Sequence, residues 1–163
     1  MLLWFAGGSF VAVWVVFRSP ALDYRLVMAG AVLPVAEAVL GGPRLLHTLL
    51  ACALGLGLVM MATRERRLLR RRWLGLPIGM FLHLVLDGTW TRSGVFWWPF
   101  LGADFGAGQI PELERGLPVV ALLEAAGIVA LAWCWRRFGL ADAGRRRTFL
   151  STGRLDRSLA AEA

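Results

Sequence analysis

The chain has 163 residues, 58% of them hydrophobic, and a mean hydropathy of +0.62. One soluble domain of this length cannot bury so much apolar surface, so the composition excludes an ordinary soluble fold and indicates an integral membrane protein. The formal net charge is +7, and arginine supplies every basic side chain because the chain has no lysine. The arginines flank the apolar segments, which favours contact with anionic lipid headgroups over nucleic-acid binding.

Five apolar segments approach the roughly 17 to 25 residues that a helix needs to cross a bilayer. The second segment is short and contains Pro34 and Glu37, so it could be tilted or re-entrant instead of a full span. We therefore predict an all-α, polytopic integral membrane protein with about five hydrophobic helices, four to five of them spans, joined by short loops. The segments are residues 1–17, 26–41, 45–62, 73–88 and 117–135.

The distribution of arginine predicts the orientation of these helices in the membrane. The run Arg64–Arg72 and the chain after Trp135 are rich in arginine, so the positive-inside rule places both in the cytoplasm. The loop 88–116 has few arginines and lies outside by alternation, as does the N-terminus. The abundance of Arg, Ala, Gly and Leu suggests a GC-rich bacterial genome, so we expect an inner-membrane protein whose C-terminus is cytoplasmic.

The polar end of the chain is expected to differ from the rest. Residues 141–163 carry several arginines and no sustained apolar face, which predicts a basic, partly disordered cytoplasmic tail. Residues 1–140 then form a single helical transmembrane domain. Within that domain, Gly55 and Gly57 are expected to let the third segment approach another helix closely.

The most informative polar residues are His83 and Asp87, four positions apart in the fourth apolar segment. Four residues are just over one helical turn, so both side chains leave the same face of a helix. Ionisable groups buried in hydrocarbon cost several kcal/mol unless they find partners, and they are therefore candidates for a functional site. The alternative is that the pair only holds helices together by hydrogen bonds.

Two further polar residues are expected near the same depth in the membrane. If the basic loop is centred near Leu68, His47 lies 21 residues before that centre and Asp87 lies 19 after it. At about 1.5 Å of rise per residue, the two side chains should differ in height by about one helical turn or less. Glu37 and His47 stand five residues either side of Gly42, so a turn there brings Glu37 to the same outer layer.

Two imidazoles and two carboxylates form a possible first shell for a divalent transition metal such as zinc, manganese or iron. Such a metal would activate water and polarise an ester or phosphoryl oxygen, with one acid as general base. Glu124 is expected at a similar depth, where it is protonated, paired with an arginine such as Arg92 or Arg115, or alternatively a further ligand. The metal ligands expected from the sequence are His47, His83, Asp87 and Glu37, and Glu37 and Asp87 are also the candidate catalytic acids.

The order and spacing of these residues resemble the DUF457 family of predicted membrane-bound metal-dependent hydrolases, the YdjM-like inner-membrane proteins. The resemblance covers residues 23 to 100 and is most specific in its last element. Val35 and Pro43 stand where the family has an acid and a histidine, so four of about six polar ligands remain. The matching stretches are Leu33 to Glu37, Pro43 to Thr48, and His83 to Asp87 with Gly94 and Trp98-Pro99.

The resemblance implies a membrane-bound metal-dependent hydrolase that uses zinc or manganese and acts on a lipid-linked or interfacial ester or phosphoester at the outer face. Trp90, Trp97 and Trp98 are expected in an aromatic belt, or alternatively at the mouth of a lipid-binding site. The other class that the sequence allows is a non-catalytic membrane protein that binds lipid or a partner and uses the polar cluster structurally. The sequence leaves open whether the protein is an enzyme.

Overall fold

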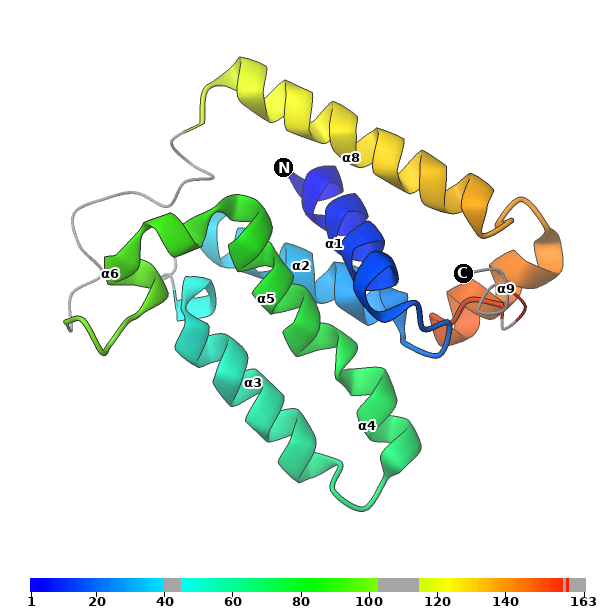
Figure 1. Ribbon diagram of the computed structural model, residues 1–163, viewed down its shortest axis with the longest axis horizontal. Helices are drawn as coiled ribbons and strands as arrows, with labels where there is room; N and C mark the ends of the chain where they lie inside the picture. The colour runs from blue at the N-terminus through cyan, green and yellow to red at the C-terminus, as the bar shows by residue number, and fades with distance from the viewer. Residues whose placement is uncertain (40–44, 103–114, 157, 159–163) are drawn as a thin grey trace.

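The computed structural model describes residues 1–39, 45–102, 115–156 and 158 (Figure 1). All regular secondary structure in these ranges is helical, which confirms the all-α fold class. The four longest helices that precede residue 100 are α1 (Leu2–Phe17), α2 (Tyr24–Val39), α3 (Leu49–Ala62) and α5 (Gly75–Asp87). The other elements are η1 (Leu45–His47), α4 (Arg67–Trp73), η2 (Thr89–Thr91), α6 (Ser93–Phe96), α8 (Leu117–Arg137) and α9 (Ala143–Thr152).

Each of the five predicted apolar segments contains a helix, but most of these helices are shorter than a bilayer requires. Among the described residues, α8 is the one helix long and apolar enough to cross a membrane, with 21 residues, and only 11% of its most apolar window is buried. The helix α1 has 16 residues, which span about 24 Å against a hydrocarbon core of about 30 Å. The long helix α8 is compatible with membrane association.

The helices form two closely packed pairs, which are joined by a contact between α1 and α2. Helix α2 packs against α5, α1 packs against both α2 and α8, and α3 contacts α5 on the side away from α8 (Figure 1). A Cβ at Gly79 would overlap the Val27 carbonyl oxygen, and a Cβ at Gly127 would overlap the backbone of Leu3. Both helix pairs therefore depend on glycine for their close approach.

The glycines expected to mediate close packing are not the ones that do so. A Cβ at Gly57 would meet no atom within 4 Å, and one at Gly55 would lie 3.8 Å from the Cβ of Pro77. The prediction for Gly55 and Gly57 was therefore wrong, because α3 contacts its neighbour loosely. The sequence pattern of small residues does not say which face of a helix meets a partner.

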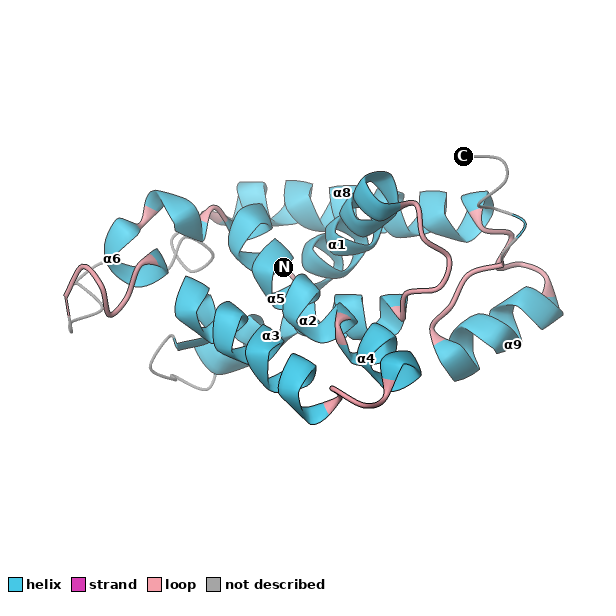
Figure 2. Cartoon of the chain, turned by 60° about the horizontal axis from the view of Figure 1, so that its bottom comes forward, coloured by secondary structure: helices cyan, strands magenta, loops and turns pink. Residues whose placement is uncertain are grey.

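Part of the predicted tail is an ordered helix that completes the core. Asp142 caps α9, accepting a hydrogen bond from the backbone N–H of Arg145 at 2.8 Å. The ring of Phe149 stacks on that of Phe10 with centroids 5.9 Å apart, and Leu155 is also buried in the same cluster. Figure 2 shows α9 at the end of the molecule, after the turn that follows α8. Residues 143–156 therefore belong to the folded domain, because Phe149 and Leu155 pack in its core.

A buried carboxylate fixes this C-terminal segment to the start of α2. Asp23 is 1% exposed; the Nη2 of Arg25 lies 3.0 Å from its Oδ2, and the Nε of Arg72 lies 3.2 Å from the same oxygen. The N–H of Tyr24 donates to the carbonyl of Gly153, and a Cβ at Gly153 would overlap the Asp23 carboxylate. Asp23 thus joins the beginning of α2 to the end of α4, while the neighbouring Tyr24 bonds the end of α9.

Replacing Asp23 by asparagine is expected to destabilise the protein by about 2 kcal/mol. This is less than the roughly 3–5 kcal/mol typical of broken buried ion pairs, because both arginines are partly exposed. Thermal unfolding in detergent should show a Tm lower by about 4–8 °C. The matched control is Asp156→Asn, whose exposed ion pair with Arg145 should contribute less than about 1 kcal/mol. Equal effects of the two substitutions would contradict a structural role for Asp23.

Candidate functional site

Because α2 and α5 are in close contact, the imidazole of His83 on α5 reaches a backbone carbonyl of α2. His83 follows Gly79 by one helical turn and is fully buried. Its Nδ1 lies 2.8 Å from the carbonyl oxygen of Ala31 on α2. Because a carbonyl oxygen only accepts hydrogen bonds, Nδ1 carries the hydrogen, and Nε2 of the neutral ring keeps its lone pair. The aromatic ring of Phe5, 4.1 Å away between centroids, packs on the imidazole.

His47 is held by the short helix η1, which Glu37 attaches to the end of α2. The carboxylate of Glu37 accepts hydrogen bonds from the backbone N–H groups of Leu45 and Leu46, both at 2.8 Å. Its Oε2 also lies 3.5 Å from Nδ1 of His47, which is fully buried. The following residue, Thr48, caps α3 by accepting from the N–H of Ala51 at 3.1 Å. Glu37 therefore holds the backbone of η1, and its carboxylate lies next to the imidazole of His47.

The two imidazoles meet through their Nε2 atoms. These nitrogens are 3.3 Å apart, and the rings are nearly perpendicular, with an interplanar angle of 80°. Contacts therefore run from Glu37 through His47 and His83 to the Ala31 carbonyl. Three segments that are distant in the sequence supply this buried line of contacts.

The position of the turn explains why His47 lies beside His83 and not level with Asp87. The chain turns at residues 63–66, because α4 is already helical from Arg67. His47 lies 18 residues before Glu65 and His83 lies 18 after it. With the turn centred near Glu65 and not near Leu68, His47 lies level with His83, and thus about one helical turn from Asp87, as expected.

Asp87 is fully buried and has partners of its own. The Oγ1 of Thr89 donates to Oδ2 of Asp87 at 2.8 Å, and Nη1 of Arg115 lies 3.1 Å from Oδ1. Arg115 also donates through Nη2 to the backbone carbonyl of Asp87. The left-handed conformation of Gly88, with φ of 75°, ends α5 and brings Thr89 back towards the carboxylate. Asp87 is therefore one member of a buried ion pair.

Glu124 is not at this site and does not pair with Arg92 or Arg115. Its Oε2 accepts from the backbone N–H of Leu3 at 2.9 Å, and its Oε1 lies 3.1 Å from the Met1 amino group. The carboxylate thus stabilises the N-terminus of α1, where unpaired N–H groups favour negative charge. This corrects the sequence-based expectation, which could not foresee that α1 and α8 cross at this level.

The structure brings together three of the four predicted ligands only as a chain of pairwise contacts. Among the side chains in residues 1–39, 45–102, 115–156 and 158, no group of three or more His, Cys, Asp or Glu is arranged to hold a metal ion. Both oxygens of Glu37 accept from backbone amides, and both oxygens of Asp87 face Thr89 and Arg115. A metal would therefore find two neighbouring histidine nitrogens, with the carboxylates engaged elsewhere.

Sequence reasoning missed the partners of the site. Arg115 was considered only for Glu124, and neither Thr89 nor the Ala31 carbonyl was considered at all. Thr89 follows Asp87 by two residues, which is a spacing that a local hydrogen bond could have suggested. The tryptophans after α5 do not distinguish an aromatic belt from the mouth of a lipid-binding site, since Trp90 is 60% and Trp97 is 45% exposed.

The described part of the chain is thus all-α, with one helix long and apolar enough to cross a membrane and with a buried pair of histidines. No protein-family model, curated protein or solved structure matches it. The resemblance to the DUF457 family accordingly depends only on the short sequence stretches around Glu37, His47 and His83 to Asp87, with Gly94 and Trp98-Pro99.

Proposed function

We propose that the protein is a membrane-embedded, metal-dependent hydrolase of a lipid-linked or interfacial ester or phosphoester, with His47 and His83 as metal ligands. The observation that carries the proposal is the 3.3 Å separation of their Nε2 atoms. Two nitrogens bound to zinc at about 2.0–2.1 Å with tetrahedral geometry are separated by about 3.3 Å. The two atoms are thus spaced as a pair of ligands would be.

The other ring nitrogens support this assignment. Metal-bound histidines usually direct their second nitrogen at a backbone carbonyl or a carboxylate, which fixes the ring and its tautomer. Here Nδ1 of His83 faces the Ala31 carbonyl, and Nδ1 of His47 faces Glu37. In this assignment Glu37 is a positioning residue for His47.

Asp87 is the proposed third ligand, because it follows His83 by one turn of α5. Its ion pair with Arg115 has to open before it can bind a metal. A divalent metal supplies a Lewis acid that polarises a carbonyl or phosphoryl oxygen and makes water a better nucleophile near neutral pH. The released Arg115 would then be available to bind an anionic leaving group or headgroup.

A polytopic arrangement in a bacterial inner membrane, with the N-terminus outside and the C-terminus in the cytoplasm, completes the proposal. Beyond α8, large apolar side chains are exposed on several helices, including Val16 at 72% and Met61 at 75%. Exposed apolar surface of this extent marks contact with lipid or another protein. In this arrangement the two histidines lie towards the outer face, since α4 and its arginines lie at the opposite end of α3 and α5 (Figure 1).

Metal content measured by elemental mass spectrometry on detergent-purified protein tests the proposal. We expect close to one zinc or manganese per chain in the wild type, and at least a tenfold loss in His47→Ala and His83→Ala. Phe5→Leu is the control, because it alters packing on His83 without removing a ligand. Absence of metal from the folded wild type, after reconstitution with zinc and manganese, would reject the hydrolase.

A second candidate function is a non-catalytic membrane scaffold. The observation in its favour is that His47, His83 and Asp87 are all fully buried and that Asp87 already has protein partners. Buried polar networks of this kind can fix the arrangement of membrane helices. For a scaffold, the histidine substitutions would lower stability and the wild type would bind no metal.

A further inference from the structure

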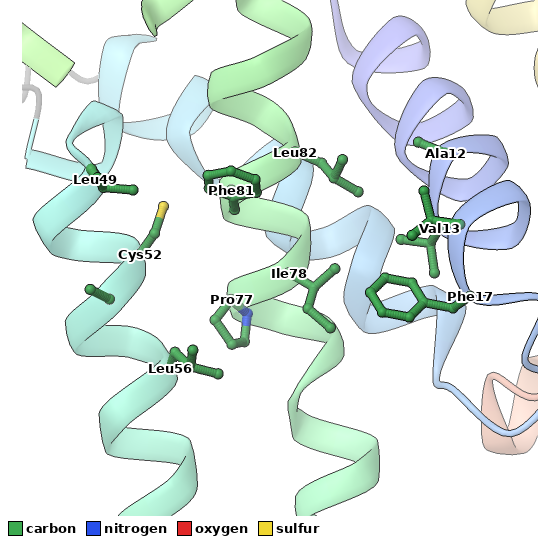
Figure 3. A pocket seen from close by; sticks show the side chains of 12 residues that line it. Ala12, Val13, Phe17, Leu49, Cys52, Leu56, Pro77, Ile78, Phe81 and Leu82 are labelled. Atoms are coloured by element: carbon green, nitrogen blue, oxygen red, sulfur yellow. The ribbon is translucent and has the colours of Figure 1, made fainter.

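An apolar groove lies between α1, α3 and α5. It has a volume of about 470 Å³ and is lined by four residues from each of these helices (Figure 3). Hydrocarbon side chains such as Val13, Leu56 and Phe81 form nearly all of its surface, with the Cys52 thiol among them. The groove therefore offers no set of hydrogen-bonding groups to a polar ligand.

One end of the groove is close in sequence to the two histidines, which do not themselves line it. At one end lie Leu49, two residues after His47, and Leu82, which directly precedes His83. The lining residue farthest along α3 is Leu56, opposite Pro77 on α5 (Figure 3). Seven residues of α3 separate Leu49 from Leu56, which corresponds to a length of about 10 Å.

The dimensions of the groove restrict what can fill it. A volume of about 470 Å³ over a length of about 10 Å gives a mean cross-section of about 47 Å². A helix with its side chains has a diameter of about 10–12 Å, hence a cross-section of at least about 80 Å². The groove is thus too small to enclose a helix of another protein, whereas a hydrocarbon chain can lie within it.

We propose that this groove binds an acyl chain of a membrane lipid and thereby directs the lipid headgroup towards His47 and His83. That the lipid is a substrate rests on the proposed hydrolase function. The inference deepens that function, because it makes the substrate a lipid with a hydrocarbon chain next to its reactive ester. The small side chain of Ala53 and the loose contact at Gly55 keep the space between α3 and α5 open. The volume is within the range of about 300–1,000 Å³ typical of ligand sites.

Photo-crosslinking of the full-length protein in detergent, with a phosphatidylcholine that carries a diazirine on one acyl chain, tests the proposal. Mass spectrometry should map the crosslinks to the groove faces of α3 and α5. Ala53→Trp fills the groove and is expected to reduce them at least tenfold. Leu54→Trp, a neighbour that is 64% exposed and does not line the groove, should leave them unchanged.

Crosslinks spread evenly over the outer surface of α3, and unaffected by Ala53→Trp, would show ordinary boundary lipid and overturn the proposal. Crosslinks between two chains across the groove would overturn it as well, since a second copy would then be the occupant. The metal content of each variant separates this proposal from the hydrolase. Ala53→Trp should retain its metal, so a loss of lipid crosslinks in a variant that still binds metal supports the acyl-chain site. If the wild type contains no metal but still forms crosslinks in the groove, only the hydrolase is rejected.

Discussion

Replacing Gly79 by leucine is expected to prevent the protein from folding. A Cβ at this position would overlap the Val27 carbonyl oxygen and approach the N–H of Ala31, so a side chain forces α2 and α5 apart. Backbone atoms cannot yield as a side-chain end can, and the cost should exceed about 3 kcal/mol. Size-exclusion chromatography and thermal unfolding in detergent should show aggregated or unfolded protein.

The matched control for this substitution is Gly57→Leu. Gly57 is also within an apolar helix, but a Cβ there meets no atom within 4 Å. Leucine favours helix over glycine by up to about 1 kcal/mol, so this variant should fold with equal or higher Tm. If Gly79→Leu melts within a few degrees of Gly57→Leu, the close contact of α2 with α5 is wrong.

The contact at Gly79 also matters for the site, because it determines the distance from α5 to the Ala31 carbonyl. One turn after Gly79, His83 bonds that carbonyl at 2.8 Å. Alanine at this position carries the same Cβ, so Gly79→Ala should also disturb the contact of His83 with the Ala31 carbonyl. Gly79 thus determines both the packing of α2 against α5 and the orientation of the His83 imidazole.

The sequence predicted the helices well because hydrophobic composition is a local property. Each apolar segment contains a helix, and the spacing of His83 and Asp87 does place both on α5. Helix ends were less predictable, since Gly88, Thr48 and Asp142 act through backbone geometry and caps. Whether these helices span a membrane follows from their length and surroundings, and only α8 meets the length criterion among the described helices.

The candidate site was predictable in part, and the reasons differ between residues. His47 could be associated with α5 because, in two antiparallel helices, residues at equal sequence distances from the connecting turn lie at equal heights. Arg115 could not be placed in the same way, because it lies in the predicted loop 88–116 and not in one of the antiparallel segments. Phe149 and Leu155 were missed for a related reason, since two apolar residues in a polar segment form no periodic pattern.

Replacing Arg115 by methionine is expected to distinguish the metal site from a structural ion pair. The substitution keeps a flexible, unbranched apolar side chain but leaves the buried Asp87 carboxylate without its cation. Removing one partner of a buried pair typically costs about 3–5 kcal/mol, so the metal-free variant should have a clearly lower Tm than metal-free wild type. If Asp87 binds metal, zinc then replaces the guanidinium as its partner.

The variant should consequently depend on metal for its stability. Zinc at 100 times its dissociation constant is expected to restore about 2.7 kcal/mol, because it binds only the folded protein. A titration of Tm with zinc measures this recovery, and the double variant Arg115→Met with His83→Ala should not show it, because it lacks one of the ligands. If zinc leaves the Tm of Arg115→Met unchanged, Asp87 serves the ion pair alone, and the buried histidines are then part of a scaffold that holds α2, η1 and α5 together.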